Sequence, residues 1–268
     1  MTRALMTRPL SELRGPIRAL FSDVDGTMTT GEAIEAQTYA ALERLGAAGI
    51  PTIMVTGRPA GFGHAFMKMT PVLACVTENG GVTFVRDGRK VVKHYGVPAA
   101  SLPEWRRRMQ DVAIDVMSKI PGARLSSDSK YREVDMAIDW NEEVSLTVDD
   151  AERAVALIRK AGMNAVRSSV HVNFGPPQFD KLSACLQVVH SVLHGDPNDL
   201  APYVYVGDAL NDAPMFGGFP NSVGVANIKT YWDELTAKPA YLTELPEGPG
   251  LRELVEHLLA IPRDSTLA

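Results

Sequence analysis

Residues 17–27 read Ile-Arg-Ala-Leu-Phe-Ser-Asp-Val-Asp-Gly-Thr. The apolar run Ile17–Phe21 predicts a buried β-strand, and a polar cluster follows it directly. Within that cluster Asp23 and Asp25 are two residues apart, so both side chains can project to the same side just beyond the strand. Thr27 is expected to cap the helix that comes next. The stretch therefore predicts a strand that delivers two carboxylates to its carboxyl end.

Two further apolar runs end in polar clusters of the same kind. Ile50–Val55 is followed by Thr56-Gly57-Arg58, and Tyr203–Val206 is followed by Gly207–Asp212. Such runs alternate with segments of helical periodicity, which is the pattern of an α/β protein with a Rossmann-like parallel sheet. The carboxyl ends of parallel strands meet at one edge of the sheet, so the polar clusters are expected to converge in space.

The segment Val97–Gln178 has a different character. Between Tyr131 and Trp140 apolar and polar residues alternate, which predicts a half-buried antiparallel strand. Ser101 and Glu104 have the spacing of a capping box at the start of a helix. We therefore expect an inserted α+β domain within an α/β core. The predicted boundaries are 97–178 for the inserted domain, with 1–96 and 179–268 forming the core.

The composition is that of an ordinary globular protein, with 45 % hydrophobic and 22 % charged residues in a chain of 268. The net charge of −5 argues against nucleic acid as a partner. The longest apolar runs fall far short of the roughly 20 residues that span a bilayer. No apolar segment typical of a signal peptide follows Arg3 and Arg8. Cys75 and Cys185 lie in apolar surroundings, which suits a reducing compartment. We expect a cytoplasmic protein without a membrane partner, and the sequence specifies no oligomeric state.

Four carboxylates are expected at the edge where the strands end, because Asp208 and Asp212 join Asp23 and Asp25 there. Carboxylates held close together repel one another unless a cation lies between them. A site made only of oxygen ligands favours a hard divalent ion, and Mg²⁺ is the natural choice. Such an ion attracts phosphate, whose remaining charge needs donors. Candidate donors are backbone N–H groups and the side chains of Thr56, Lys181 and Asn211.

Four strings of residues resemble, in this order, the four motifs of the haloacid dehalogenase (HAD) superfamily: Asp23-Val24-Asp25-Gly26-Thr27, Thr56-Gly57-Arg58, Lys181 and Gly207-Asp208-Ala209-Leu210-Asn211-Asp212. The string Glu78-Asn79-Gly80 and the long segment between the second and third motifs resemble the type IIB subfamily, the Cof-like and sugar-phosphatase group with a C2-type α/β cap. The resemblance covers residues 17–85 and 180–258. One departure is Leu182, because relatives usually have glycine after the lysine.

The resemblance implies a Mg²⁺-dependent phosphatase that acts on small-molecule phosphate esters, such as sugar phosphates, through an aspartyl-phosphate. It makes Asp23 the nucleophile, and Asp25 the general acid and then the general base. It also implies that Mg²⁺ is held by the carboxylates of Asp23 and Asp208 and the backbone carbonyl of Asp25, with Asp212 nearby. The residues that would bind the phosphoryl group are Thr56, Gly57, Lys181 and Asn211.

In relatives with this cap, the cap sheet covers the active site, so polar residues on its strands are candidates to contact the substrate. An ordinary solvated sheet face is the alternative for these residues, and Asn79 can instead stabilise its own turn. The candidate substrate contacts are Arg58, Asn79, Glu133, Asp135, His171 and Asn173.

Two other functions remain as alternatives to a phosphatase. A phosphohexomutase of the phosphomannomutase type resembles this motif set and cap, and it would interconvert hexose 1- and 6-phosphates without releasing phosphate. A non-catalytic sugar-phosphate-binding protein would bind such ligands without turnover.

Overall fold

The computed structural model describes residues 7–262, and the chain forms two compact units. The first unit contains the chain up to Thr56, Met69–Cys75 and the chain from Cys185 onward. The second contains Gly57–Lys68 and Val76–Ala184. The predicted inserted domain, 97–178, falls within the second unit, and its boundaries stay a prediction. Residues 1–6, where the search for a signal peptide began, lie outside the described residues.

The first unit is built on a parallel sheet. Its strands, in spatial order, run β1-β13-β12-β11-β2-β3-β4. The five neighbouring pairs from β1 to β3 are all parallel, which confirms the α/β fold class. The strands are β1 (Arg8–Pro9), β2 (Ala19–Ser22), β3 (Thr52–Val55), β4 (Ala74–Thr77, of which the last two residues belong to the second unit), β11 (Tyr203–Gly207), β12 (Asn221–Gly224) and β13 (Tyr241–Leu242).

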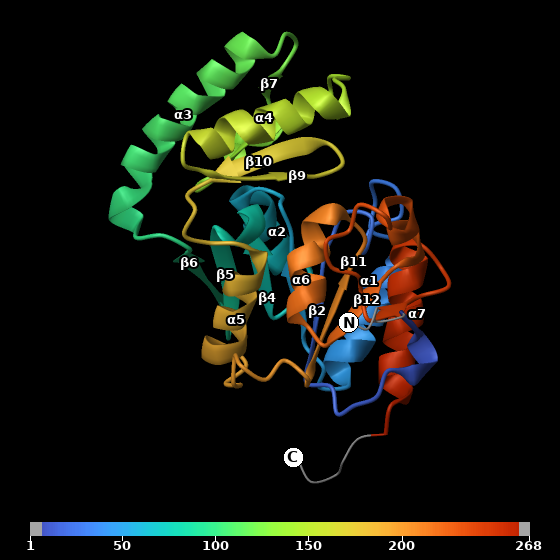
Figure 1. Cartoon of the computed structure of the whole chain (residues 1–268). Helices are drawn as coiled ribbons and strands as arrows, with labels where there is room; N and C mark the ends of the chain where they lie inside the picture. Colours follow the sequence, from blue (N-terminus) through green and yellow to red (C-terminus); the bar gives the residue numbers. More distant parts are fainter. Residues whose placement is uncertain (1–6, 263–268) are drawn as a thin grey trace. The chain divides into compact units, whose positions relative to one another are not determined.

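Strands β2 and β11 form the centre of this sheet, and every residue of both is buried. In their register Ser22 pairs with Val206, so the residues that follow the two strands emerge at the same edge. The rings of Phe21 and Tyr203 meet edge to face, with centroids 6.1 Å apart. The helices of this unit are α1 (Ala36–Ala47), most of α5 (Lys181–Ser191), α6 (Ala213–Gly218) and α7 (Glu247–Ala260), and α1 packs against α7 (Figure 1).

The second unit contains a four-stranded antiparallel sheet in the order β7-β8-β10-β9. Helices α3 and α4 pack together and cover one face of it (Figure 1). That face is apolar, with Ile138, Val172 and Phe174 almost completely buried. The elements are α2 (Ala60–Met69), β5 (Val82–Asp87), β6 (Lys90–Tyr95), α3 (Leu102–Lys119), β7 (Arg124–Leu125), β8 (Met136–Asp139), α4 (Val148–Lys160), β9 (Asn164–Arg167) and β10 (His171–Gly175). Strands β5 and β6 form an antiparallel hairpin, and β5 neighbours β4.

Two local predictions for this unit were wrong. The predicted strand 131–140 is shorter, because only Met136–Asp139 forms β8 and Ser127–Tyr131 is a 3-10 turn. The Ser101 hydroxyl donates to the Pro98 carbonyl at 2.7 Å and makes no capping bond, so Ser101 and Glu104 form no capping box. The capping box lies instead at the start of α4.

Both cysteines are buried, and burial raises the pKa of the Cys75 thiol to about 12. The prediction that both thiols are buried is therefore confirmed. Among the described residues, no helix is long and apolar enough to cross a membrane.

Candidate active site

Three carboxylates converge at the carboxyl ends of the central strands. Asp23 follows β2, and its backbone N–H donates to the Val206 carbonyl at 2.9 Å. Asp208 follows β11, and Asp212 ends the 3-10 turn that comes next. One oxygen atom from each of the three lies within 4.8 Å of the other two, and all three residues are buried. The predicted convergence of Asp23 with Asp208 and Asp212 is thus observed.

Asp208 is held by neutral donors from two other segments. The Thr27 hydroxyl donates to Asp208 Oδ1 at 3.1 Å, and Asn227 Nδ2 donates to Asp208 Oδ2 at 2.9 Å. Thr27 is therefore not a helix cap as predicted, because α1 begins only at Ala36. Gly26 adopts a φ of 76°, and a Cβ atom there would lie 2.3 Å from Asp208 Oδ2. The turn after β2 thus needs a glycine to make room for this carboxylate.

Asp212 is anchored through both of its oxygens. Oδ1 accepts from the Tyr205 hydroxyl at 2.6 Å, and Oδ2 accepts from the backbone N–H groups of Asp208 and Ala209 at 3.0 and 3.2 Å. Burial, followed by the charges of Asp212 and Asp23, raises the pKa of Tyr205. Its hydroxyl therefore stays protonated and donates a hydrogen bond to Asp212. Asp212 thereby fixes the backbone that carries Asp208.

This arrangement fits a hard divalent cation. The donor atoms are carboxylate oxygens, they are buried, and they converge on a common point, which is the environment that Mg²⁺ and similar ions require. Asp25 is exposed and its side chain is not part of the cluster. Its predicted contact to the ion runs through its backbone carbonyl and stays a prediction.

Two of the predicted phosphate-binding residues lie in the same unit as the cluster. Thr56 is buried directly after β3. Asn211 lies in the 3-10 turn Leu210–Asp212, and its Oδ1 atom is buried without a hydrogen-bond partner among the described residues. A buried polar atom with no partner costs free energy unless a ligand or water binds it, so Asn211 has the character of a ligand contact.

The other two, Gly57 and Lys181, belong to the second unit. Lys181 is buried and is the first residue of α5. Gly57 packs against the side chain of Asn79, whose Nδ2 would lie 3.2 Å from a Cβ atom at position 57. Asn79 therefore occupies the space beside Gly57, which explains why position 57 carries no side chain.

Glu78 plays a part that the sequence did not reveal. Its side chain is completely buried, and its carboxylate accepts backbone N–H bonds from four residues at 2.6–2.9 Å. Glu78 and Asn79 adopt φ values of 51° and 53°, a conformation that few residues other than glycine favour. The turn is thus strained and the carboxylate compensates by binding the surrounding backbone. The four donors are Ala60, Glu133, Val134 and Asp135.

These bonds also explain why the predicted strand begins late. The N–H groups of Glu133, Val134 and Asp135 are bound to the Glu78 carboxylate, so they do not pair with a neighbouring strand. Strand pairing starts at Met136, where the N–H and C=O groups turn to β10.

Asp135 lies beside Arg132 and Asn173. It accepts from Arg132 Nη1 at 2.8 Å and from Asn173 Nδ2 at 3.4 Å. Burial raises the pKa of Asp135 to about 8, with Arg132 opposing the shift and the charge of Glu78 adding to it. Asp135 and Asn173 border a cavity of about 20 Å³, which has room for about one water molecule.

The remaining predicted substrate contacts have partners within the second unit. His171 Nε2 lies 2.8 Å from a carboxylate oxygen of Glu142. The Glu133 carboxylate accepts from Lys93 Nζ at 2.7 Å and from the Tyr95 hydroxyl. The guanidinium of Arg58 lies over the ring of Phe62, 4.9 Å from its centroid. The structure thus joins Asp135 with Asn173 but gives His171 and Glu133 different neighbours.

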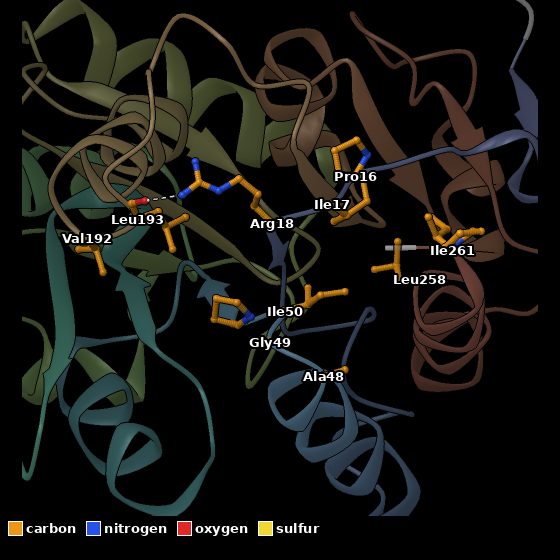
Figure 2. A pocket seen from close by; sticks show the side chains of 12 residues that line it. Pro16, Ile17, Arg18, Ala48, Gly49, Ile50, Val192, Leu193, Leu258 and Ile261 are labelled. Carbon is orange, nitrogen blue, oxygen red and sulfur yellow. Dashed lines mark hydrogen bonds between the residues drawn. The ribbon is translucent and has the colours of Figure 1, made fainter. Parts of the chain in front are cut away.

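A larger cavity lies at the opposite end of the central strand β2. It has a volume of about 700 Å³, and Figure 2 shows its lining residues. Arg18 projects along it and donates to the Leu193 carbonyl at 3.1 Å. This cavity lies at the amino ends of β2 and β3, whereas the predicted site residues follow the carboxyl ends. None of the predicted site residues therefore lines it. The lining residues are 16–18, 48–51, 192–193, 258 and 261–262.

Sequence reasoning missed two residues that hold the carboxylate cluster. Asn227 follows β12 just as Asp208 follows β11, so its position beyond a parallel strand was a usable signal. Asn227 also donates to the Gly26 carbonyl at 3.0 Å, which ties it to the turn after β2. Tyr205 lies inside β11, and nothing in its sequence context distinguishes it from a core aromatic residue.

Comparisons with known proteins find similar hydrolases and similar folds. A family profile described as haloacid dehalogenase-like hydrolase matches residues 20–117. A phosphoglycolate phosphatase of Methanococcoides burtonii is 23 % identical over 245 residues, which cover 91 % of this chain and 97 % of that protein. A Thermoplasma acidophilum protein of known structure has the same fold, with a TM-score of 0.71 at 18 % identity over 90 % of this chain and 98 % of its own. A solved HAD subclass IIB sugar phosphatase gives a TM-score of 0.64 at 17 % identity, over 90 % and 98 %.

Proposed function

We propose that the chain is a haloacid dehalogenase-like hydrolase and acts as a Mg²⁺-dependent phosphatase of small phosphorylated metabolites. The match of residues 20–117 to the hydrolase profile, the similarity to phosphatases over most of the chain, and the fold shared with a type IIB sugar phosphatase support this proposal. Sugar phosphates are the first substrate class. Phosphoglycolate is the second, since the name of the M. burtonii relative points to it. The observation that carries the proposal is the convergence of Asp23, Asp208 and Asp212 at one edge of the sheet.

In this proposal Asp23 is the nucleophile. A carboxylate oxygen of Asp23 forms a bond to phosphorus while the bond from phosphorus to the substrate oxygen breaks. Asp25, which is exposed beyond β2, donates a proton to the departing oxygen. Asp25 then accepts a proton from the water that attacks the aspartyl-phosphate, and Asp23 is regenerated as phosphate leaves.

The carboxylates of Asp23 and Asp208 and the backbone carbonyl of Asp25 would hold the Mg²⁺ ion. When bound, the ion offsets the repulsion between the Asp23 carboxylate and the phosphoryl oxygens. Thr27 and Asn227 orient Asp208, and Asp212 fixes the backbone at Asp208. These hydrogen bonds set the geometry before any ligand binds, which reduces the reorganisation that binding requires.

Donors for the phosphoryl oxygens come from four residues. The Thr56 hydroxyl, the Gly57 N–H, the Lys181 ammonium and the Asn211 amide provide hydrogen bonds and one positive charge for the three equatorial phosphoryl oxygens, over which negative charge is spread in the transition state. The unpartnered Oδ1 of Asn211 is an acceptor, so it supports a hydrogen-bond donor at that position, such as a water molecule or a substrate hydroxyl, while the Nδ2 group is the proposed donor to the phosphoryl oxygens. The residues proposed to contact the remainder of the substrate are Arg58, Asn79, Glu133, Asp135, His171 and Asn173.

A phosphate-release assay tests the proposal. The purified protein is given a panel of sugar phosphates, polyol phosphates and phosphoglycolate, in Mg²⁺ and again after chelation with EDTA. We expect release of inorganic phosphate from at least one class in Mg²⁺ and none after chelation. Interconversion of hexose 1- and 6-phosphates without release would instead establish the mutase, and tight binding without turnover would establish the non-catalytic alternative.

A further inference from the structure

The backbone directly after Thr56 is held by side chains that lie far away in the sequence. We call residues 57–60 the Gly57 turn. Arg132 Nη1 donates to the Gly57 carbonyl at 3.1 Å. The Glu78 carboxylate accepts from the Ala60 N–H at 2.9 Å, and the Glu78 N–H donates to the Arg58 carbonyl at 3.0 Å. Three backbone groups of one short turn are therefore fixed by two residues.

Arg132 is itself immobilised by a geometry that only a guanidinium can satisfy. Its Nε and Nη2 atoms donate to the two carboxylate oxygens of Asp128, at 2.9 and 2.8 Å. Its Nη1 atom donates to Asp135 as well as to Gly57. The side chain is 1 % exposed. A forked arrangement of this kind uses the fixed planar geometry of arginine, and the single ammonium group of lysine cannot reproduce it.

The same Glu78 carboxylate also binds the backbone at the start of β8. Its Oε2 atom accepts from Val134 at 2.6 Å and from Asp135 at 2.9 Å. Arg132 and Asp135 flank this segment, so the Gly57 turn and residues 132–135 share two independent anchors. In these four bonds Glu78 binds only backbone N–H groups and no positively charged side chain. Its role here is therefore to hold the backbone and not to neutralise a charge.

We propose that Arg132 and Glu78 are positioning residues, which set the Gly57 peptide for binding the phosphoryl group. The proposal rests on the proposed function in one respect, namely that the Gly57 N–H binds phosphate. The Arg132 bond fixes the peptide between Gly57 and Arg58, and with it the ψ angle of Gly57. Without this bond Gly57 can change its backbone conformation, and the Gly57 N–H, which lies on the preceding peptide, loses the support that holds it toward a phosphoryl oxygen. A binding group that must be reoriented on each encounter loses both affinity and rate.

Arg132→Lys and Arg132→Gln test the proposal together. Inorganic phosphate serves as the probe, as a competitive inhibitor of ester hydrolysis. For a positioning role we expect both variants to raise the inhibition constant for phosphate about tenfold or more and to lower kcat. If Arg132 acted only through its charge, the lysine variant would retain the unmodified value and the glutamine variant alone would be impaired. That result would overturn the proposal.

Arg159→Gln is the matched control. Arg159 also donates to a backbone carbonyl in the second unit, that of Ala165 at 2.9 Å, but it touches no residue of the Gly57 turn. We expect its kinetics to equal those of the unmodified protein. Glu78→Gln keeps the shape of the side chain but replaces one of the two accepting carboxylate oxygens by an NH₂ group. It should raise the inhibition constant for phosphate, as the Arg132 variants do.

Amide hydrogen exchange separates this proposal from the proposed function. Exchange at residues 57–60 should become faster in both Arg132 variants and stay unchanged in Arg159→Gln. Unchanged exchange in the Arg132 variants would overturn the positioning role even in an active phosphatase. Faster exchange in a protein that neither hydrolyses esters nor binds phosphate would sustain the anchoring and refute the proposed function. If the Arg132 variants do not fold, Asp128→Asn, which loosens the fork at a partly exposed site, should give the same two effects at smaller size.

Discussion

The chain contains two groups of carboxylates, buried except for the partly exposed Asp128, that serve different ends. In the first unit, Asp23, Asp208 and Asp212 turn oxygen atoms toward one common point. In the second, Glu78, Asp128 and Asp135 surround Arg132 and a set of backbone N–H groups, and we call these four residues the Arg132 cluster. In the first group Asp208 and Asp212 also bind donors of the chain, but the three carboxylates still bring one oxygen each close together, which makes a place for a cation. In the second group the oxygens are directed to donors of the chain, which holds the structure together.

The number of acidic residues does not distinguish a ligand site from a structural cluster. Each group has three carboxylates, and each brings together two distant parts of the sequence. The direction in which the oxygens point separates a site from a scaffold. Four substitutions or conditions test this contrast.

The largest effect should follow Asp23→Asn. The amide oxygen is a much weaker nucleophile than a carboxylate, so we expect phosphate release to fall at least about a thousandfold. Initial rates on the best ester of the panel provide the measurement, and a thermal unfolding curve confirms the fold. Asp233→Asn, at an exposed position, is the control and should keep full activity. Residual activity above one tenth would place the nucleophile elsewhere.

Removal of the metal should have the next largest effect on activity. It should act through Asp23, Asp208 and Asp212 and leave the Arg132 cluster unaffected. EDTA is expected to abolish phosphate release, with recovery on addition of excess Mg²⁺. Mg²⁺ should also raise the melting temperature of the unmodified protein, because a ligand that binds only the folded state stabilises it. Asp208→Asn should lose this shift, whereas Asp128→Asn in the Arg132 cluster should keep it. Equal shifts in both variants would contradict the assignment of the two groups.

Asn227→Ala should produce a smaller change at the same site. Removing the donor to Asp208 Oδ2 leaves this carboxylate less well oriented, and loss of such a supporting contact typically weakens metal binding by about 10- to 100-fold. Titration of activity with Mg²⁺ measures the effect. Asn221→Ala is the matched control, because Asn221 donates to the Ala201 carbonyl at the other end of β12. An unchanged Mg²⁺ requirement in Asn227→Ala would remove Asn227 from the site.

The smallest effect concerns stability and belongs to the Arg132 cluster. The pKa of Asp135 is about 8 in the folded protein and about 4 in an unfolded chain, so between these pH values the folded state binds the extra proton. The free energy of unfolding should therefore fall as the pH rises through this window, by at most about 1.4 kcal/mol per pH unit. Urea unfolding from pH 5 to 9 should show this slope reduced in Asp135→Asn and retained in Asp111→Asn, at an exposed position on α3. Parallel curves for Asp135→Asn and the unmodified protein would refute the raised pKa.

The sequence predicted the first group well and the second hardly at all. Asp23 and Asp208 each follow an apolar strand, so local sequence is enough to place them at one edge of a parallel sheet. The contacts of Glu78 with residues 133–135, and of Arg132 with Gly57, join positions 55 to 75 residues apart, and no local pattern encodes them. For the same reason the alternation at 131–140 predicted too long a strand, since the Glu78 carboxylate occupies the N–H groups that a strand would use.

The anchoring of the Gly57 turn also limits how such proteins can be recombined. A chimera that replaces residues 97–178 with the corresponding segment of a relative would bring in a foreign partner for Glu78 and Gly57, because Arg132 and the 133–135 backbone lie inside the exchanged segment. A successful exchange of specificity would need to transfer residues 57–60 and 78–79 along with it. The part of the gene that is proposed to encode the substrate contacts is therefore discontinuous, and its pieces would have to be exchanged together.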